Sequence, residues 1–139
     1  MRVHLKINSH QRSADGQTEH MAQEQSGELS AGLKEITLSY RDQAEGLEHS
    51  QVMLRLNEKG CQMERSGRAD MRLDFVPGQT RSTLYRVDGM EFDLSATTGK
   101  LEWRFENGRL DLLLCYELCL SGGLPTKTRL ELKAWPLES

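Results

Sequence analysis

Residues 107–120, NGRLDLLLCYELCL, decide the fold. After the Asn107-Gly108 pair, apolar side chains recur at every second position, the period of a β-strand with one buried face. The six on this face are Leu110, Leu112, Leu114, Tyr116, Leu118 and Leu120. At about 3.3 Å per residue this strand spans roughly 35 Å, longer than most sandwich strands. Such length is typical of a tilted strand that wraps a closed barrel.

The same alternation recurs along the rest of the chain. It predicts strands around Val3–Ile7, Ile36–Tyr40, Val52–Leu56, Met71–Phe75, Thr83–Val87, Met90–Leu94, Leu101–Phe105 and Leu130–Ala134. Met63 and Arg65 share the apolar face of a further strand, and the polar stretch from Thr18 to Leu29 is counted as another. The tally is nine or ten strand segments.

Turn-forming residues separate these strands. The turns are predicted at Glu58-Lys59-Gly60, Ser66-Gly67, Pro77-Gly78, Asp88-Gly89, Thr98-Gly99 and Asn107-Gly108. Such residues supply the positive φ angles of tight hairpins, so consecutive strands should be antiparallel. No stretch carries an apolar stripe at helical spacing, which excludes a parallel α/β sheet. We therefore predict an all-β fold: a closed or nearly closed antiparallel up-and-down barrel of about eight to ten strands, with a β-sandwich as the alternative.

Length and composition indicate one domain, spanning residues 1–139, in the cytoplasm. The chain is 37% hydrophobic and 28% charged with a net charge of -3, which disfavours nucleic acid and anionic membranes as partners. The N-terminal residues alternate in polarity, unlike a signal peptide, and no run reaches membrane-spanning length. The three cysteines, an odd number, fit reduced thiols better than a disulfide framework.

We expect no enzymatic activity, metal or cofactor. No nucleophile elbow, phosphate loop or dinucleotide fingerprint occurs, and His4, His10, His20 and His49 show no metal-binding spacing and are expected at the surface. Cys115 and Cys119 would lie roughly 13 Å apart on one face of a strand, too far to share an ion or a disulfide.

Arg65 is the exception among the charged residues, because its parity places it on the apolar side of its strand with Met63. If it points into the barrel, its charge needs a carboxylate, carbonyl oxygens or an anionic ligand; the alternative is a rim position reaching water. Tyr40, Thr83, Tyr85 and Tyr116 share the inward parity and add hydroxyl groups. These five residues form our candidate ligand-binding set.

Two functions remain open at this point. The barrel either binds a small anionic or amphipathic molecule in its interior or mouth, or has a solid core and acts through its surface. Trp103 and the three phenylalanines are expected to point inward, which gives the solid core equal weight. The outer face carrying Leu113, Cys115 and Cys119 is half apolar and could form a homodimer contact.

A resemblance to a known family rests on particular residues. They are Met63-Glu64-Arg65-Ser66-Gly67, Met71, Phe75, Gly78, Thr83, Tyr85, Gly89 and Leu94, then Gly27 with Leu38-Ser39-Tyr40, and Leu112, Leu114, Tyr116 and Leu118. In this order they resemble the YwiB-like family of bacterial domains of unknown function. The resemblance implies a calycin-type, lipocalin-like barrel, and it implies no activity.

Overall fold

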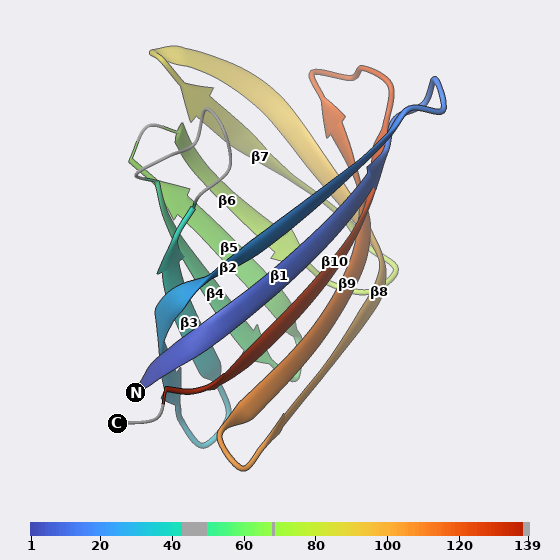
Figure 1. Cartoon of the computed structure of the whole chain (residues 1–139). Coiled ribbons are helices and arrows are strands. Elements are labelled where there is room, and N and C mark those ends of the chain that lie inside the picture. The colour runs from blue at the N-terminus through green and yellow to red at the C-terminus, as the bar shows by residue number, and fades with distance from the viewer. Residues whose placement is uncertain (43–49, 68, 138–139) are drawn as a thin grey trace.

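The computed structural model describes residues 1–42, 50–67 and 69–137, and within these ranges every regular element is a strand. The ten strands form one closed antiparallel barrel (Figure 1). They are β1 (Arg2–Arg12), β2 (Thr18–Ala31), β3 (Ile36–Arg41), β4 (Gln51–Asn57), β5 (Gly60–Ser66), β6 (Ala69–Phe75), β7 (Thr80–Val87), β8 (Met90–Glu106), β9 (Arg109–Leu120) and β10 (Thr126–Pro136). The predicted fold class is confirmed, and the sandwich alternative is wrong.

The order around the barrel follows the order along the chain. Each strand pairs with its neighbours in sequence, and β1 closes the barrel by pairing with β10, where Val3 lies opposite Pro136 and Arg12 opposite Lys127. β6 and β7 share fewer paired residues than any other two neighbouring strands. Only Ala69 lies opposite Val87 and Asp70 opposite Arg86. Closure removes most of the free edges that an open sheet would leave.

The core occupies the inside of the barrel, as the alternation of the strands requires. Buried residues stand at every second position of β4 and of the first half of β9, for example Val52, Leu54 and Leu56 on β4. The inward rows of the other strands except β7 supply the rest of the buried residues of a single apolar cluster. Of the six residues in the predicted apolar row of β9, those at 110, 112 and 114 are buried and those at 116 and 118 are half-buried, whereas Leu120 is 49% exposed.

Two hairpins show how the turn sequences set the register. Asp88 and Gly89 have φ angles of 51° and 76°, and Asn107 and Gly108 have 52° and 76°. Two successive positive φ angles define the type I′ turn, whose twist suits antiparallel strands. Sequence reasoning missed a third such pair, Ser121 and Gly122, with φ angles of 51° and 71°.

The predicted turn at Thr98-Gly99 is wrong. Met90–Glu106 is one continuous strand, β8, and its pairing with β9 shifts register between Thr98 and Lys100, which marks a β-bulge. Thr98 has no positive φ, and Gly99 is absent from the left-handed region as well. A glycine in a strand permits a bulge or sharp bend as readily as a turn, and here the bulge bends β8 instead of ending it.

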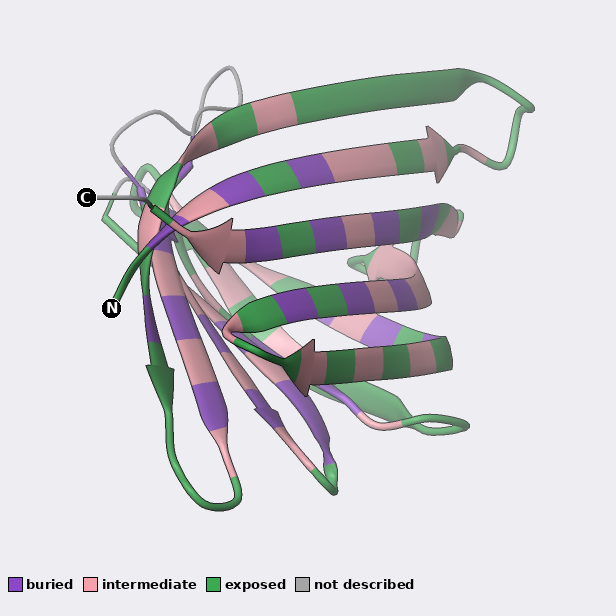
Figure 2. Ribbon diagram, turned by 60° about the horizontal axis from the view of Figure 1, so that its bottom comes forward, coloured by how far each residue is buried: buried purple, intermediate pink, exposed green. Residues whose placement is uncertain are grey.

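The barrel has two unequal halves. Strands β3 to β6 contain six or seven residues each, and we call them the short-strand half. Strands β8, β9, β10, β1 and β2 contain 17, 12, 11, 11 and 14 residues, and we call them the long-strand half. In Figure 2 these five long strands lie side by side; exposed residues alternate with less exposed ones along most of their length, and the first five residues of β2 are all exposed. The long strands therefore continue where the short-strand half has ended.

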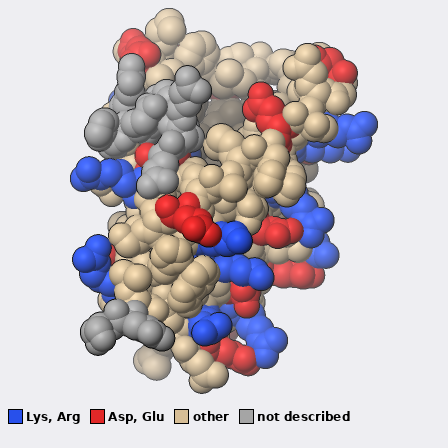
Figure 3. Space-filling view, viewed as in Figure 1, with Lys and Arg blue, Asp and Glu red and all other residues tan. Residues whose placement is uncertain are grey.

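Charged residues of both signs cover the outside of the barrel. The face seen in Figure 3 carries Lys and Arg side chains interspersed with Asp and Glu side chains. Several pairs form ion pairs along one strand or across two, including Lys100–Glu102 at 3.6 Å and Lys127–Glu117 at 3.7 Å. Mixed charge of this kind produces no extended field of one sign.

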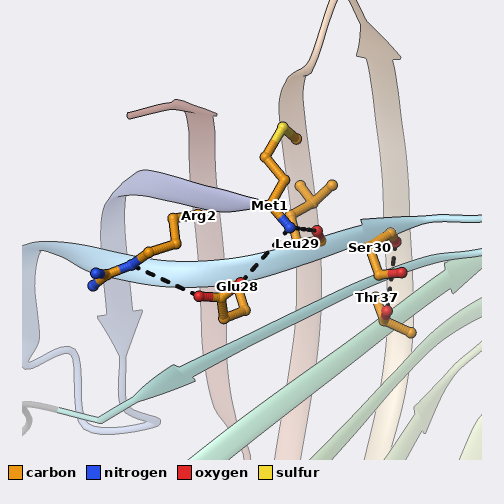
Figure 4. Close-up of polar contacts among 6 residues, drawn as sticks. All are labelled: Met1, Arg2, Glu28, Leu29, Ser30 and Thr37. Atoms are coloured by element: carbon orange, nitrogen blue, oxygen red, sulfur yellow. Dashed lines mark hydrogen bonds and ion pairs between the residues drawn. The ribbon is translucent and has the colours of Figure 1, made fainter. Parts of the chain in front are cut away.

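The beginning of β1 is held against β2 (Figure 4). The Met1 amino group donates to the Leu29 carbonyl oxygen at 3.0 Å, and the Leu29 N–H donates to the Met1 carbonyl oxygen at 2.8 Å. Glu28 lies 3.7 Å from both the Met1 amino group and the Arg2 guanidinium. These contacts fix the register of β1 against β2 at this end.

Candidate functional site

Arg65 points into the barrel and forms an ion pair with Asp42. The Arg65 Nη1 atom donates to the Asp42 Oδ2 atom, and the two side chains are 13% and 6% exposed. Arg65 continues the inward row of Cys61 and Met63 on β5, and Asp42 continues the inward row of β3 past Tyr40. The partner that a buried arginine requires is thus a carboxylate of the same chain.

Three buried weak acids, two phenols and a thiol, lie on the same inner face of the barrel as this ion pair. Burial raises the pKa of the Tyr40 phenol well above its usual value; the nearby Asp42 carboxylate raises it further, and the Arg65 guanidinium lowers it in part. Burial raises the pKa of Tyr116 to about 12, against smaller lowering effects of the Thr128 hydroxyl and Arg65. Burial also raises the pKa of the Cys61 thiol to about 12. All three groups are therefore neutral at physiological pH.

The structure brings together three of the five predicted ligand-binding residues. Arg65, Tyr40 and Tyr116 are near enough to affect one another electrostatically, and the Tyr116 ring packs against Phe75 with 4.7 Å between ring centroids. Thr83 and Tyr85 lie on β7 opposite Leu94 and Phe92, half-buried, and Tyr85 packs on the core. Asp42 was missed, although extending the inward parity of Ile36, Leu38 and Tyr40 by two residues would have found it.

A pocket of about 750 Å³ forms a groove that crosses β2, β1, β10, β9 and β8. Most of its side chains have the parity opposite to the buried rows, so the groove lies on the outer face of the long-strand half. It is lined by His10, Gln11, Arg12, Thr18, Glu19, His20, Thr97, Gly99, Cys115, Tyr116, Glu117, Lys127, Thr128 and Arg129. We call it the outer groove. Tyr116 is its one residue from the predicted ligand-binding set.

The outer groove combines cationic groups with ring and backbone surfaces. His10 lies opposite His20 in the β1–β2 ladder, and their rings stack with centroids 4.2 Å apart and planes at 4°. Arg12, Lys127 and Arg129 lie beside them; Lys127 pairs with Glu117 at 3.7 Å and Arg129 with Glu131 at 3.0 Å. Arg12 forms no ion pair with any residue that the structure describes. A guanidinium without a carboxylate partner is suited to an anion.

The bulge of β8 contributes to the floor of the outer groove. Gly99 is exposed and lines the groove, and a Cβ atom at this position would lie 3.7 Å from the Cys115 carbonyl oxygen, with no other atom closer. This is an ordinary van der Waals distance, and the φ angle of Gly99 suits other residues. A side chain at Gly99 would therefore extend into the groove without straining the backbone.

The other predicted surface residues lie as follows. Leu113, Cys115 and Cys119 are half-buried on the outer face of β9; Cys115 lines the outer groove, and Leu113 lines a neighbouring hollow of about 380 Å³. The three cysteines are free thiols. His4 packs against Trp135 with 4.8 Å between ring centroids, and His49 lies outside the described residues.

Two kinds of feature are absent from residues 1–42, 50–67 and 69–137. These ranges contain no cluster of three or more His, Cys, Asp or Glu side chains arranged to hold a metal ion. They also contain no helix of the length and apolar character needed to cross a membrane.

Comparison with known proteins places the chain in a family. The profile of a domain of unknown function, DUF1934, matches residues 5–132. The chain belongs to the DUF1934 family. A structure of a similar protein, described as the ywiB protein from Bacillus subtilis, superposes with a TM-score of 0.82 at 18% sequence identity, covering 97% of this chain and 92% of that one.

The resemblance that the sequence indicates is thereby confirmed, and at this identity the superposition establishes a shared fold. No curated protein matches the chain. The DUF1934 family carries no assigned activity in its description, so a function must be argued from the site itself.

Proposed function

We propose that this DUF1934 domain binds a small amphipathic molecule with an anionic group, and that the ligand lies in the outer groove. The observation that carries the proposal is the groove of about 750 Å³ in which Arg12, without an ion-pair partner among the described residues, lies near Lys127, Arg129 and the stacked histidines. The volume falls within the usual range of small-molecule sites. The cations would hold the anionic group, while the stacked rings and exposed backbone would contact the apolar part.

The barrel interior is the weaker position for this ligand. Arg65, the interior cation that the sequence singles out, is already paired with Asp42, and the neighbouring phenols and thiol are neutral. An anion at Arg65 would have to displace Asp42 from a nearly buried ion pair. This exchange is unfavourable because it leaves the Asp42 carboxylate buried without a partner, unless that carboxylate is protonated or moves to water. The interior prediction, with Tyr40, Thr83, Tyr85 and Tyr116, is kept as the competing position.

A binding role is proposed in preference to catalysis because the sequence contains no recognisable nucleophile, base or metal motif. A cytoplasmic location is proposed on the free thiols of Cys61, Cys115 and Cys119. The calycin relationship likewise stays a prediction from the sequence resemblance. An alternative role through the outer face of Leu113, Cys115 and Cys119 is also kept, and Cys115 belongs to both surfaces.

The test is thermal unfolding with dodecanoate, compared with uncharged dodecanol. Because a ligand selective for the native state raises the midpoint, dodecanoate should stabilise the wild type more than dodecanol does. Arg12→Gln with Arg129→Gln should abolish the difference, and Gly99→Leu, which fills the groove, should abolish both shifts. Arg72→Gln, an exposed arginine of β6 outside the groove, is the matched control and should respond as the wild type does.

The positions are separated by Arg65→Ala. Loss of the dodecanoate shift in this variant, with a normal shift in Arg12→Gln/Arg129→Gln and Gly99→Leu, would place the ligand in the interior. The same midpoint with and without either compound, at concentrations that remain below micelle formation, would contradict a fatty-acid-like ligand in either position and favour the surface role.

A further inference from the structure

The second half of β8 has a free edge. From Thr80 to Val87, β7 pairs with residues 90–97 of β8, and the last backbone hydrogen bonds on this edge join Thr98 to Gly78 and Gln79. Residues 100–106 continue alone against β9, and no other described strand pairs with them. An unpaired edge presents a row of N–H and C=O groups that can accept another strand.

Burial along this segment is incomplete on one side. Leu101, Trp103 and Phe105 have the inward parity, yet all three are half-buried. Their direct partners on β9, Leu114, Leu112 and Leu110, are 0%, 4% and 1% exposed. The apolar row is therefore covered by β9 and left partly open at the edge of β8.

The sequence of the free edge is self-complementary. Residues 100–106 read KLEWRFE. In an antiparallel pair of two such segments centred on Trp103, Lys100 lies opposite Glu106 and Glu102 opposite Arg104. Leu101 then lies opposite Phe105, and the two Trp103 residues face each other. Every charged residue meets the opposite charge and every apolar residue meets an apolar one, which is the favourable arrangement for directly opposed residues.

Shifted registers lose this match. Moving the pairing by two residues in one direction places Lys100 opposite Arg104 and Glu102 opposite Glu102 of the second chain. Moving it in the other direction places Glu102 opposite Glu106 and Arg104 opposite Arg104. Directly opposed like charges are destabilising. A shift by one residue would place apolar side chains opposite charged ones, so that the apolar rows of the two copies would lie on opposite faces of the sheet. The charge pattern thus specifies one register with two-fold symmetry.

We propose that the free edge of β8 pairs with the same edge of a second copy of this chain, which joins the two barrels in a symmetric dimer through one continuous sheet. The interface is isologous, because both copies use the same residues. Within each chain Lys100 lies 3.6 Å from Glu102 and Arg104 lies 2.7 Å from Glu106, so the four charges are already aligned along the edge. This dimer is distinct from a contact through Leu113, Cys115 and Cys119, and it does not depend on a ligand in the outer groove.

Two double variants test the proposal without changing the net charge. Lys100→Glu/Glu102→Arg keeps an opposite-charge pair within the strand, but it places the new carboxylate opposite Glu106 and the new guanidinium opposite Arg104 of the second copy. Arg104→Glu/Glu106→Arg does the same from the other end. In a mixture of the two variants, one chain of each kind pairs with every charge matched again. The measurement is sedimentation equilibrium over a concentration series, for each variant alone and for the equimolar mixture.

We expect a wild-type dimer whose dissociation constant rises about tenfold or more in each double variant, because four contacts per dimer become repulsive. The mixture should recover the wild-type dissociation constant with one chain of each variant per dimer. The thermal midpoint of each variant is measured first, since Arg104 and Glu106 also face Asp111 and Arg109 on β9. Lys100 and Glu102 face uncharged Cys115 and Leu113, so the first variant should retain the wild-type midpoint at a protein concentration at which both are monomeric.

Three results would overturn the proposal. The first is a wild type that stays monomeric throughout the series. The second is dimerisation of both variants with wild-type affinity, which would place the contact elsewhere, for example at Leu113, Cys115 and Cys119. The third is two folded variants that remain monomeric when mixed, since charge matching would then not determine the association.

Discussion

The short-strand half and the long-strand half use the same alternating pattern for different purposes. In β4 the inward residues Val52, Leu54 and Leu56 are each 1% exposed. In β2 the inward row includes Gln23, Gln25 and Met21, and the exposure of this row rises toward the β1–β2 turn. Where a strand lies within the closed barrel, other strands cover its inward side chains. Where a long strand extends beyond its shorter neighbours, its side chains and its edge stay exposed and can form binding surfaces. The outer groove and the free edge of β8 both belong to the long-strand half.

Breaking the interior ion pair should have the largest effect. Asp42→Ala leaves the Arg65 charge nearly buried without its carboxylate, so we expect a loss of about 3–5 kcal/mol in the free energy of unfolding. The double variant Asp42→Leu/Arg65→Met removes both charges and should lie much closer to the wild type. Urea unfolding measures both. A single variant as stable as the double variant would contradict a buried, paired arginine.

A core truncation should come next and should differ between the halves. Leu54→Ala in the short-strand half removes a fully buried side chain and should cost about 3 kcal/mol. Leu101→Ala, at the free edge of the long-strand half, removes a side chain that is only half-buried, and about 1 kcal/mol is expected. Equal losses in urea unfolding would mean that the two halves are buried alike in solution.

Alkaline pH should weaken the barrel by a smaller amount. The folded barrel raises the pKa of Cys61 from 9.0 to about 12, so its neutral thiol is favoured in the native state. This contribution to stability is complete below pH 9 and is lost as the pH rises toward 12. We expect Cys61 alone to reduce the free energy of unfolding by about 1 kcal/mol between about pH 8 and pH 10. Cys61→Ala should show a correspondingly shallower pH dependence, and an unchanged slope would refute the assignment.

The smallest effect should follow removal of a surface ion pair in the long-strand half. Lys127 and Glu117 lie 3.7 Å apart with side chains that are 71% and 43% exposed. Water screens such a pair, so Glu117→Gln should change the free energy of unfolding by less than about 0.5 kcal/mol. Added salt should reduce even this difference. A change as large as that of Asp42→Ala would mean that the pair is buried in solution by self-association, and sedimentation of the variant would test that explanation.

Alternation along single strands predicted the inward rows and most of the turns, because each depends on a few neighbouring residues. It placed Arg65 on the apolar side of its strand but left open whether the side chain enters the barrel or reaches water at the rim. It did not predict the outer groove, which five strands form together and which depends on sheet curvature. Thr98-Gly99 was misjudged because a glycine suits a turn and a bulge alike, and the partner strand decides between them. The Asp42–Arg65 contact joins strands separated by β4, so it required the barrel and not a strand pattern.

The pairing of β1 with β10 has a consequence for how the chain folds. Every other strand pair joins sequence neighbours, so hairpins can form locally and add to one another. The last pair joins Val3 to Pro136, which closes a loop of nearly the whole chain. Because loop entropy grows with the logarithm of length, this closure costs only about 3 kcal/mol more than closing a short hairpin. We expect the folding transition state to contain hairpins from the middle of the chain, with β1 and β10 joining after it.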